Sequence, residues 1–259
     1  MYKRQEYYSA VGGDKQDAFD DYAFYGGMPL ILSRPTDAAK MAYLKSLFSE
    51  VYLKDIVERK KIKREDVLSA IIDLLCSSVG SLTNPSRIAD TFASINQVKI
   101  SPETIARYLD YFADAFMISH AKRYDIKGRK YIGSPQKYYY SDIGLRNARL
   151  NFRQTEENHI MENIIYNELI VRGFTVDVGV VEYNYKDADG KSKKTNLGVD
   201  FIASDGNKKF YIQSALTVGE EEKRLQEVRP YSRIADSFTK VVIVKDNIIP
   251  WRDENGILY

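Results

Sequence analysis

Two acids and one amide are spaced so that they could meet around a metal ion. Glu162 lies in the first turn of an expected helix, and Asp200 and Gln213 lie on two expected strands joined by a short turn. Carboxylate and carbonyl oxygens are ligands for hard cations such as Mg²⁺, which can activate water against a phosphodiester. The sequence demands no cofactor, but Mg²⁺ or Mn²⁺ is what Glu162, Asp200 and Gln213 could bind.

This set lacks two groups that phosphodiester hydrolysis needs. Gln213 places a neutral amide where a further acid would stand, and Ala215, two residues along the same strand, places a methyl group where a lysine would stand. Two carboxylates hold a divalent ion less firmly than three. We therefore expect a degenerate, inactive nuclease site with weak metal binding, which favours a role other than that of an enzyme.

A helix and a hairpin would have to position these residues. Residues 160–169 carry an apolar stripe at helical spacing, and Gly173 follows as a stop signal. Residues 198–203 and 209–215 have the composition of strands, with an Asp-Gly-Asn turn at 205–207 between them. A hairpin of this kind would bring Gln213 beside Asp200.

Further elements complete an α/β domain over residues 151–259. A charged helix is predicted over 220–230, where Pro230 ends it, and a buried parallel strand over 241–244. The lysine-rich segment 186–194 is predicted to be a polar loop with a solvated tip, although its lysines could also touch nucleic acid.

The preceding residues, 81–150, have the pattern of a winged helix. Asn84-Pro85 and Ser101-Pro102 each place a capping residue before a proline, so two helices are expected to begin there. The second helix leads into two strand-like segments with a turn at Gly128. Helix, turn, helix and basic hairpin together predict a winged helix.

The expected wing carries the strongest basic patch of the chain. Such a patch neutralises phosphates and gives affinity with little dependence on base sequence. On the preceding helix Arg107 could reach bases, but acids at 103, 110 and 114 would repel the backbone. The alternative is that the winged helix is a packing module that binds no nucleic acid, and that the charges of its hairpin are merely solvated. The predicted nucleic-acid-binding residues are Arg107, Lys122, Arg123, Lys127, Arg129, Lys130 and Lys137.

The first 80 residues are expected to be helical. Helices are predicted over 17–25, 37–60 and 64–77, with a turn at 26–29 whose two glycines and proline end the first of them. The predicted fold is thus mixed α+β: a helical segment (1–80), a winged helix (81–150) and an α/β domain (151–259).

Composition limits the classes of function. Of 259 residues 44% are hydrophobic and 29% charged, as in ordinary globular proteins, and the net charge of +2 requires any basic patch to be local. The chain has twenty tyrosines, whose apolar rings and polar hydroxyls suit contact with other macromolecules. A general compositional habit of the source organism explains this number equally well. Cys76, the single cysteine, is expected to be a buried small residue. No long apolar run occurs, so we expect a cytoplasmic protein without membrane contact.

Seven motifs occur together along the chain: Tyr25-Gly26-Gly27-Met28-Pro29, Tyr52-Leu53-Lys54-Asp55-Ile56, Lys122-Arg123-Tyr124-Asp125-Ile126-Lys127-Gly128, Tyr138-Tyr139-Tyr140-Ser141-Asp142-Ile143-Gly144-Leu145-Arg146-Asn147, Met161-Glu162-Asn163, Gly198-Val199-Asp200-Phe201 and Tyr211-Ile212-Gln213-Ser214-Ala215. Together they resemble the carboxy-terminal domain of unknown function that follows AAA-type ATPase modules in many bacterial and archaeal proteins. That domain is similar to the PD-(D/E)xK nuclease superfamily, which implies an α/β fold like that of restriction endonucleases for residues 151–259.

The resemblance implies a site formed by Glu162, Asp200 and Gln213, and a segment 1–80 like the lid of an ATPase. Members with a complete site carry Glu and Lys at the positions of Gln213 and Ala215. No phosphate-binding loop Gly-x-x-x-x-Gly-Lys-Ser/Thr is present, so this chain alone should not hydrolyse ATP. We expect it to be a fragment of a longer protein, cut at both ends, whose ATPase module is a partner.

Three functions follow from these observations. The leading hypothesis is a non-catalytic module that associates with DNA without sequence preference. The second is an active nuclease dependent on Mg²⁺ or Mn²⁺. In it a lysine elsewhere, such as Lys208 or Lys209, would supply the positive charge that Ala215 lacks. The third is a protein-docking or regulatory module that binds no nucleic acid, and formation of oligomers is open in each case.

Overall fold

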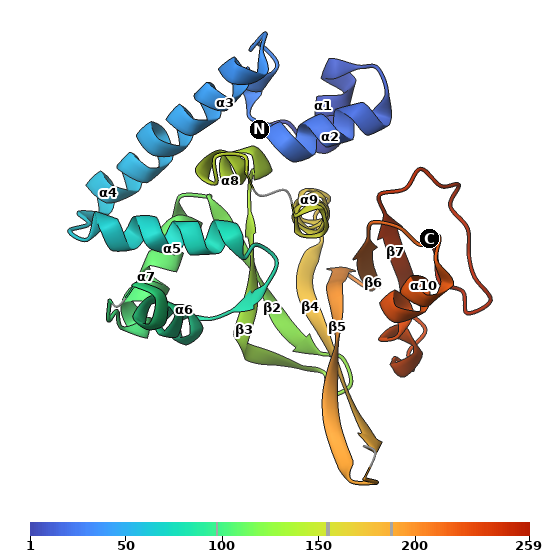
Figure 1. The fold of residues 1–259 in the computed structure, drawn as a ribbon. Helices are drawn as coiled ribbons and strands as arrows, with labels where there is room; N and C mark the ends of the chain where they lie inside the picture. The colour runs from blue at the N-terminus through green and yellow to red at the C-terminus, as the bar shows by residue number, and fades with distance from the viewer. Residues whose placement is uncertain (97, 154–155, 187–188) are drawn as a thin grey trace. The chain divides into compact units, whose positions relative to one another are not determined.

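The backbone divides into two compact units. The structure, a computed structural model, describes residues 1–96, 98–153, 156–186 and 189–259. Unit 1 comprises Met1–His120 and Lys137–Ile164, and unit 2 comprises Ala121–Gln136 and Ile165–Tyr259 (Figure 1). Each unit is described by itself below. The division into three domains expected from the sequence stays a prediction.

Unit 1 is mainly helical, as the sequence predicts. Its helices are α1 (Arg4–Val11), α2 (Lys15–Tyr25), α3 (Asp37–Ser46), α4 (Lys54–Lys60), α5 (Glu65–Ser77), α6 (Pro85–Thr91), α7 (Pro102–Asp114) and α8 (Ile143–Arg149), with a 3-10 turn at Pro29–Ile31 and π-helical turns at Leu47–Leu53 and Phe92–Asn96. The helix predicted over 37–60 is present, with a π-helical segment inside it. Helix α1 was not predicted, because its polar sequence buries only Tyr7.

Both predicted cap-proline signals begin helices. The side chain of Asn84 accepts a hydrogen bond from the Arg87 amide (2.8 Å), and that of Ser101 accepts one from the Thr104 amide (3.2 Å). Each cap satisfies an amide that has no partner inside its helix, and the proline after it needs none.

The strands are β1 (Leu82–Thr83), β2 (Ile118–Asp125), β3 (Lys130–Tyr140), β4 (Thr175–Lys186), β5 (Ser192–Asp205), β6 (Lys208–Ala215) and β7 (Thr239–Val244). Within the described part of the chain they form a seven-stranded sheet in the order β1-β3-β2-β4-β5-β6-β7. Strands β4, β5 and β6 are antiparallel neighbours, whereas β2 with β4 and β6 with β7 are parallel. The mixed α/β class predicted from the sequence is therefore present.

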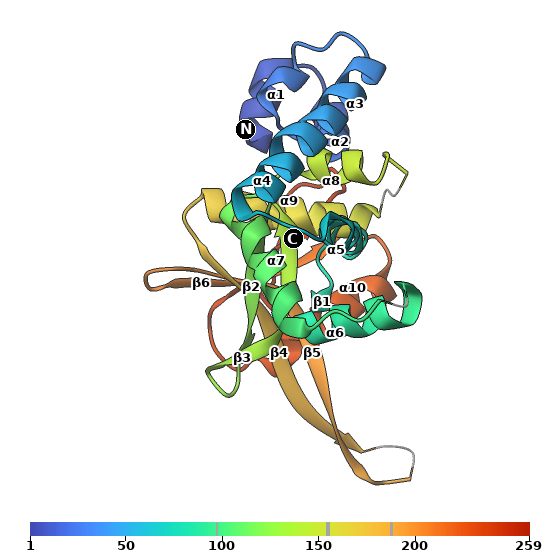
Figure 2. The same cartoon turned by 90° about the vertical axis from the view of Figure 1, so that its left-hand side faces the viewer.

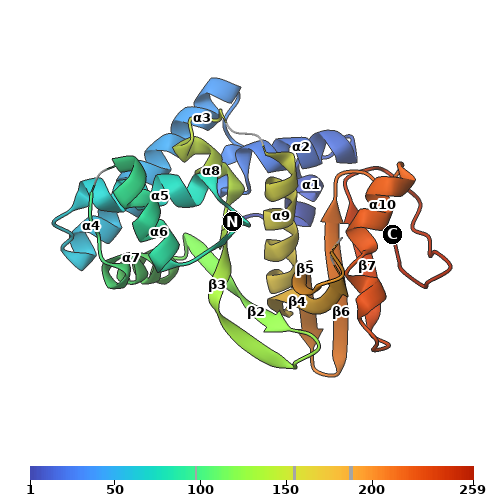
Figure 3. The ribbon, with the colours of Figure 1, turned by 60° about the horizontal axis from the view of Figure 1, so that its bottom comes forward.

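Strands β4 to β7 lie side by side in unit 2, with α10 (Glu221–Val228) beside them (Figure 3). The predicted hairpin of 198–203 and 209–215 is confirmed as the end of β5 and β6, and the predicted parallel strand is β7. Strand β7 is less buried than expected, since only Val242 of its residues is buried.

The predicted loop over 186–194 needs correction. Strands β4 and β5 reach into it as a hairpin, with Lys186 paired with Ser192 and Tyr185 paired with Lys193. Asp187 and Ala188 of the predicted loop lie outside the described residues. Helix α9 (Glu157–Val171) contains the predicted helix 160–169, and its residues are shared between the two units.

Each unit has its own hydrophobic core. The core of unit 1 gathers aliphatic and aromatic residues from its helices, and Cys76 is fully buried in it, as predicted. The core of unit 2 lies on one face of its strands and includes Val181, Val199, Tyr211 and Tyr231. In the part of the chain that the structure covers, no helix has the length and apolar character needed to cross a membrane.

A buried clamp joins two distant motifs in unit 1. Asp142, at the start of α8, accepts hydrogen bonds from the Gly27 amide (2.8 Å) and the Leu145 amide (3.0 Å). A Cβ atom on Gly144 would collide with the carbonyl oxygen of Tyr25, so only glycine allows this approach of the two backbones.

Asn147 extends the clamp by one helical turn. Its side-chain amide donates to the carbonyl oxygens of Ala23 (3.1 Å) and Phe24 (2.9 Å) at the end of α2. These acceptors are among the carbonyls that a helix end leaves without a partner. The residues of the Tyr25–Pro29 and Tyr138–Asn147 motifs thus hold α2 to α8.

Candidate functional site

A β-bulge places Asp200 in the sheet of unit 2. Asp177 of β4 pairs with Ile202 of β5, but Gly179 pairs with Val199, so Asp200 and Phe201 together stand opposite a single residue. Bulges bend a strand and change the direction of a side chain, and they are frequent beside functional sites. The carboxylate of Asp200 accepts hydrogen bonds from the amide and the hydroxyl of Ser214, both 3.0 Å long.

Gln213 supports the bulge with both atoms of its side-chain amide. Its carbonyl oxygen accepts from the Asp200 amide (2.7 Å), and its nitrogen donates to the carbonyl oxygen of Glu227 (3.1 Å). A glutamate at this position could not donate to Glu227, because an ionised carboxylate is only an acceptor. Gln213 is brought beside Asp200 as predicted. Ala215, two residues on, is buried in the core.

Glu227 on α10 is a second acid beside Asp200 that sequence reasoning missed. Burial raises the pKa of the Glu227 carboxyl, and the charge of Asp200 raises it further. The sequence offered only a weak signal, since Glu227 sits in a run of charged residues with the appearance of a solvated helix face. Two neighbouring carboxylates repel each other, and a cation between them would relieve that repulsion.

Glu162 belongs to unit 1 and has different partners. Its carboxylate accepts hydrogen bonds from the Lys137 ammonium (2.8 Å) and the Tyr139 hydroxyl (2.5 Å), and it lies against Gly80. The structure therefore describes Glu162 in one unit, and Asp200 with Gln213 in the other. Among the described residues, no three His, Cys, Asp or Glu side chains form a cluster that could hold a metal ion.

The predicted basic residues separate into two groups. Lys122, Lys127, Arg129 and Lys130 are exposed in unit 2, and Arg123 is half-buried there. Lys137 was expected on the exposed wing, and this placement is wrong: it forms an ion pair with Glu162 in unit 1, and only 13% of its side chain is exposed. A lysine in mid-strand can turn inward when a buried carboxylate needs a partner.

The turn between β2 and β3 is held by local contacts. Asp125 accepts a hydrogen bond from the Gly128 amide (2.9 Å), and the rings of Tyr124 and Tyr131 meet edge to face with their centroids 5.3 Å apart. The Tyr131 hydroxyl donates to Asp177 of β4 (3.1 Å). Burial raises the pKa of Asp177, and the hydrogen bond from Tyr131 and the charge of Lys122 oppose that rise.

Arg107 is exposed on α7 in unit 1, together with acidic side chains. Its guanidinium lies 3.4 Å from the Thr104 hydroxyl, while Glu103 and Asp110 are exposed on the same helix. Asp114 forms an ion pair with Lys60 (2.8 Å). The exposed side of this helix is therefore mixed in charge and not basic.

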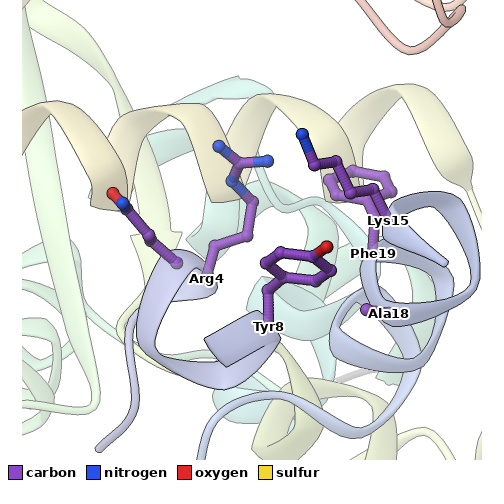
Figure 4. Close-up of a pocket in the computed structure, with 6 residues that line it drawn as sticks. Arg4, Tyr8, Lys15, Ala18 and Phe19 are labelled. Carbon is purple, nitrogen blue, oxygen red and sulfur yellow. The ribbon is translucent and has the colours of Figure 1, made fainter. Parts of the chain in front are cut away.

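A hollow of about 350 Å³ lies between α1 and α2. None of the predicted site residues lines it, and two cationic side chains, Arg4 and Lys15, stand beside the ring of Tyr8 (Figure 4). The residues around it are Arg4, Gln5, Tyr8, Lys15, Ala18 and Phe19.

Comparison with known proteins gives relatives without a described activity. Over 225 residues the chain is 32% identical to an uncharacterized protein of Haemophilus influenzae, covering 87% of this chain and 52% of that protein. It is 27% identical over 235 residues to an uncharacterized protein of Methanocaldococcus jannaschii, covering 91% of this chain and 49% of that protein. The chain thus spans about half the length of these relatives.

No solved structure matches the chain. The model of one protein family, a domain of unknown function called DUF8612, matches residues 16–156. This range is more than half of the 259 residues and includes all of α2 but its first residue, α8 and the clamp between them. The chain therefore belongs to the DUF8612 family.

Proposed function

We propose that this chain associates with duplex DNA without sequence preference through the turn between β2 and β3, and that it does not cut DNA. The observation that carries this proposal is the charge of the turn. Lys127, Arg129 and Lys130 are exposed, and none of them forms an ion pair with a residue that the structure describes. Cations without a protein counter-ion can neutralise phosphates and release the ions condensed on DNA.

The shape of the turn supports the same proposal. The acid nearest in sequence, Asp125, is engaged by the Gly128 amide, and the Tyr131–Asp177 hydrogen bond ties β3 to β4. The backbone that carries the three cations is therefore held at both sides of the turn. An ordered backbone loses less conformational entropy on binding than a mobile one does.

The chain order β1, α6, α7, β2, β3 suits a winged helix, with the β2–β3 hairpin as the wing. In that fold α7 would be the helix that enters the major groove. Its exposed Glu103 and Asp110 would meet phosphates there, and Arg107 is a single cation beside them. This favours binding through the wing and the DNA backbone over recognition of bases.

We also propose that the chain is part of a longer, AAA-type ATPase, whose ATPase module is its partner in a cytoplasmic protein. The resemblance of its motifs to the domain that follows such modules supports this, and the relatives are about twice the length of the matched region. The same resemblance supports a nuclease-like fold for residues 151–259, with a degenerate site at Asp200 and Gln213.

Metal-dependent nuclease activity is the second candidate, and the proximity of Asp200 and Glu227 favours it. Two carboxylates could share a divalent cation such as Mg²⁺ or Mn²⁺. Against hydrolysis, the Gln213 amide is used at both ends by the backbone, and the Ala215 position has no cation. Weak metal binding without cleavage fits these contacts better.

DNA binding can be tested by fluorescence anisotropy of a labelled random duplex over a series of salt concentrations, with Mg²⁺ present and the DNA checked afterwards for cuts. The variant K127Q/R129Q/K130Q should bind at least about tenfold more weakly at low salt. Its slope of log K against log salt should be shallower by about 2 to 3, because each phosphate contact contributes about 0.9.

The matched control is K45Q/K54Q/K63Q, which removes the same charge from exposed lysines of unit 1. It should change affinity by less than about twofold, apart from the effect of net charge. Equal losses in both triple variants would contradict a local contact at the turn. No binding at low salt by the unmodified chain would support a protein-docking module, and Mg²⁺-dependent cuts that D200A abolishes would support the nuclease.

A further inference from the structure

Strands β4 and β5 extend past their neighbours as a two-stranded ribbon. Strand β2 pairs with β4 only as far as Val180, and β6 pairs with β5 only from Phe201 onward. Residues 181–186 and 192–197 form the part beyond, which we call the arm; within the described residues it has no third strand (Figure 2). At its base Val181 belongs to the core of unit 2, whereas residues 182–186 and 192–197 are exposed or half-buried.

The two faces of the arm differ in chemistry. Tyr183 and Tyr185 lie on one face with their ring centroids 6.1 Å apart, and Lys193 stands directly across from Tyr185. The opposite face holds Lys194 and Glu182, which form an ion pair of 2.8 Å. One face therefore combines two tyrosine rings with a lysine, while the other carries the Glu182–Lys194 ion pair.

Two arginines enlarge the aromatic face at the base of the arm. The guanidinium groups of Arg229 and Arg233 lie 5.7 and 5.0 Å from the ring centroid of Tyr183, and Arg229 donates a hydrogen bond to the Tyr183 hydroxyl. Both arginines are exposed, and 42% of Tyr185 is exposed at the outer end. Cations and rings thus follow one another along this face.

Charge complementarity indicates the chemistry of the partner. Residues 181–197 contain four lysines and three acids, a net charge of +1, and Arg229 with Arg233 raises this to +3. One of the three acids, Glu182, is used by Lys194 on the opposite face. A polyanion with flat rings matches such a face, because its phosphates meet cations while its bases stack on tyrosines.

We propose that the aromatic face of the arm binds single-stranded nucleic acid, with a base stacked on Tyr185 and phosphates near Lys193, Arg229 and Arg233. A duplex hides the faces of its bases and would leave the exposed Tyr185 ring without a partner. This surface is separate from the cations of the β2–β3 turn, and the inference does not depend on duplex binding there.

The test uses the whole chain and labelled twenty-nucleotide oligo(dT) and oligo(U), followed by fluorescence anisotropy at low salt. Tyr185→Ala should weaken binding about tenfold, since stacking on an aromatic side chain contributes about 1 to 3 kcal/mol per base and 1.4 kcal/mol is tenfold. Tyr185→Phe keeps the ring and should retain affinity within about twofold. Tighter binding of oligo(dT) or of oligo(U) identifies DNA or RNA as the source of the strand.

Neighbouring lysines on opposite faces provide the matched control. Lys193→Ala and Lys194→Ala remove the same charge one residue apart, but only Lys193 shares the face of Tyr185. We expect about a threefold loss for Lys193→Ala, in the range of a single exposed charge contact, and less than about 1.5-fold for Lys194→Ala. Thermal melting of each variant confirms that the fold is kept.

Three results would overturn the proposal: no binding of either oligonucleotide, equal losses on the two faces of the arm, or a preference for a duplex of the same length that Tyr185→Ala abolishes. The triple variant of the β2–β3 turn separates this test from the proposed function. The triple substitution should lower duplex affinity. The factor by which Tyr185→Ala weakens oligo(dT) binding should be the same, within about twofold, with and without the triple substitution. Loss of duplex binding therefore does not bear on whether the arm binds single strands.

Discussion

Asp142 in unit 1 and Asp200 in unit 2 both accept hydrogen bonds from backbone amides, yet their surroundings differ. Asp142 is 2% exposed and receives the amides of Gly27 and Leu145, with no acid described as a partner. Burial raises the pKa of Asp142, and these amide hydrogen bonds oppose the rise. Asp200 is half-buried, and its charge adds to the burial that raises the pKa of Glu227.

These different surroundings indicate that Asp142 stabilises the fold, whereas Asp200 could take part in cation binding. A buried carboxylate enclosed by amides has its hydrogen-bonding capacity directed to the backbone and holds two segments together. A partly exposed carboxylate beside another acid can still bind a cation, which would reduce the repulsion between the two acids.

Each unit contains one residue that can report on its unfolding. Cys76, the single cysteine, lies in unit 1, and Trp251, the single tryptophan, lies in unit 2.

The largest effect is expected for Asp142→Ala. It leaves the buried amides of Gly27 and Leu145 without their acceptor and removes the cap of α8, which should lower the free energy of unfolding by about 3 kcal/mol. The rate at which a thiol reagent labels Cys76 measures this, because Cys76 is buried and its pKa is raised by burial to about 12.

Asp142→Asn is the control, since it keeps one acceptor oxygen and the shape of the side chain. Labelling of Cys76 should be intermediate, between the unmodified chain and Asp142→Ala. Equal labelling of all three proteins would show that the clamp does not stabilise unit 1.

A smaller loss of about 2 kcal/mol is expected for Gly144→Ala, because its Cβ would collide with the backbone of Tyr25 and α2 would have to move from α8. Gly198→Ala in β5 is the matched control, as a Cβ there meets nothing within 4 Å. Thermal unfolding followed by circular dichroism should show a lower melting temperature for the first variant alone. A similar change in both would mean that the close approach is not tight.

Asp200→Ala should cost about 1 kcal/mol, less than Asp142→Ala. It removes the hydrogen bonds from Ser214, but these groups are only partly buried and water can replace the carboxylate. The fluorescence of Trp251, stacked on Tyr259 with ring centroids 4.4 Å apart, should report the change during denaturation by urea. A loss as large as that of Asp142→Ala would remove the distinction between the two acids.

The smallest effect is a gain in stability for Glu227→Gln. Because the folded pKa of Glu227 is raised, the folded chain holds this proton more firmly than the unfolded chain does. Stability should therefore fall as pH rises from the ordinary Glu range through the raised pKa, and the variant should lack that decline. At neutral pH the gain should be below about 1 kcal/mol.

Unfolding by urea at several pH values checks the Glu227→Gln prediction, and the two proteins should converge below the ordinary pKa of glutamate. Added Mg²⁺ or Mn²⁺ should stabilise the unmodified chain more than the variant if the pair holds a cation. A constant difference between the proteins at all pH values would contradict repulsion between Asp200 and Glu227.

Much of the helical part could be predicted from the sequence because its signals are local. The caps at Asn84 and Ser101 need only the next three residues, and the apolar stripe of α5 buries one side of that helix. The outer part of the arm, Lys186 and residues 192–194, was predicted as a loop for the opposite reason. Its strands have no buried face at their outer end, so periodicity gave no signal there.

The candidate site was only partly predictable. A hairpin turn fixes the register that brings Gln213 to Asp200, and this follows from residues within 15 positions. The β-bulge at Asp200 changes the pairing register of β4 and β5 by one residue, and hydrogen bonds join Asp200 to Gln213 and Ser214 there. No local sequence pattern predicts this bulge. Glu227 and the Lys137–Glu162 ion pair depend on contacts between distant elements, which a single sequence does not give.

The path of the chain through β2 and β3 has a consequence for biosynthesis. Residues 121–136 leave unit 1, enter unit 2 and return, and the partner of β2 in unit 2, β4, is translated about fifty residues after β2. On the ribosome this edge of β2 stays without a strand partner until β4 emerges. Unpaired strand edges attract other chains. We therefore expect nascent chains halted between β3 and β4 to need a chaperone more than the finished chain does.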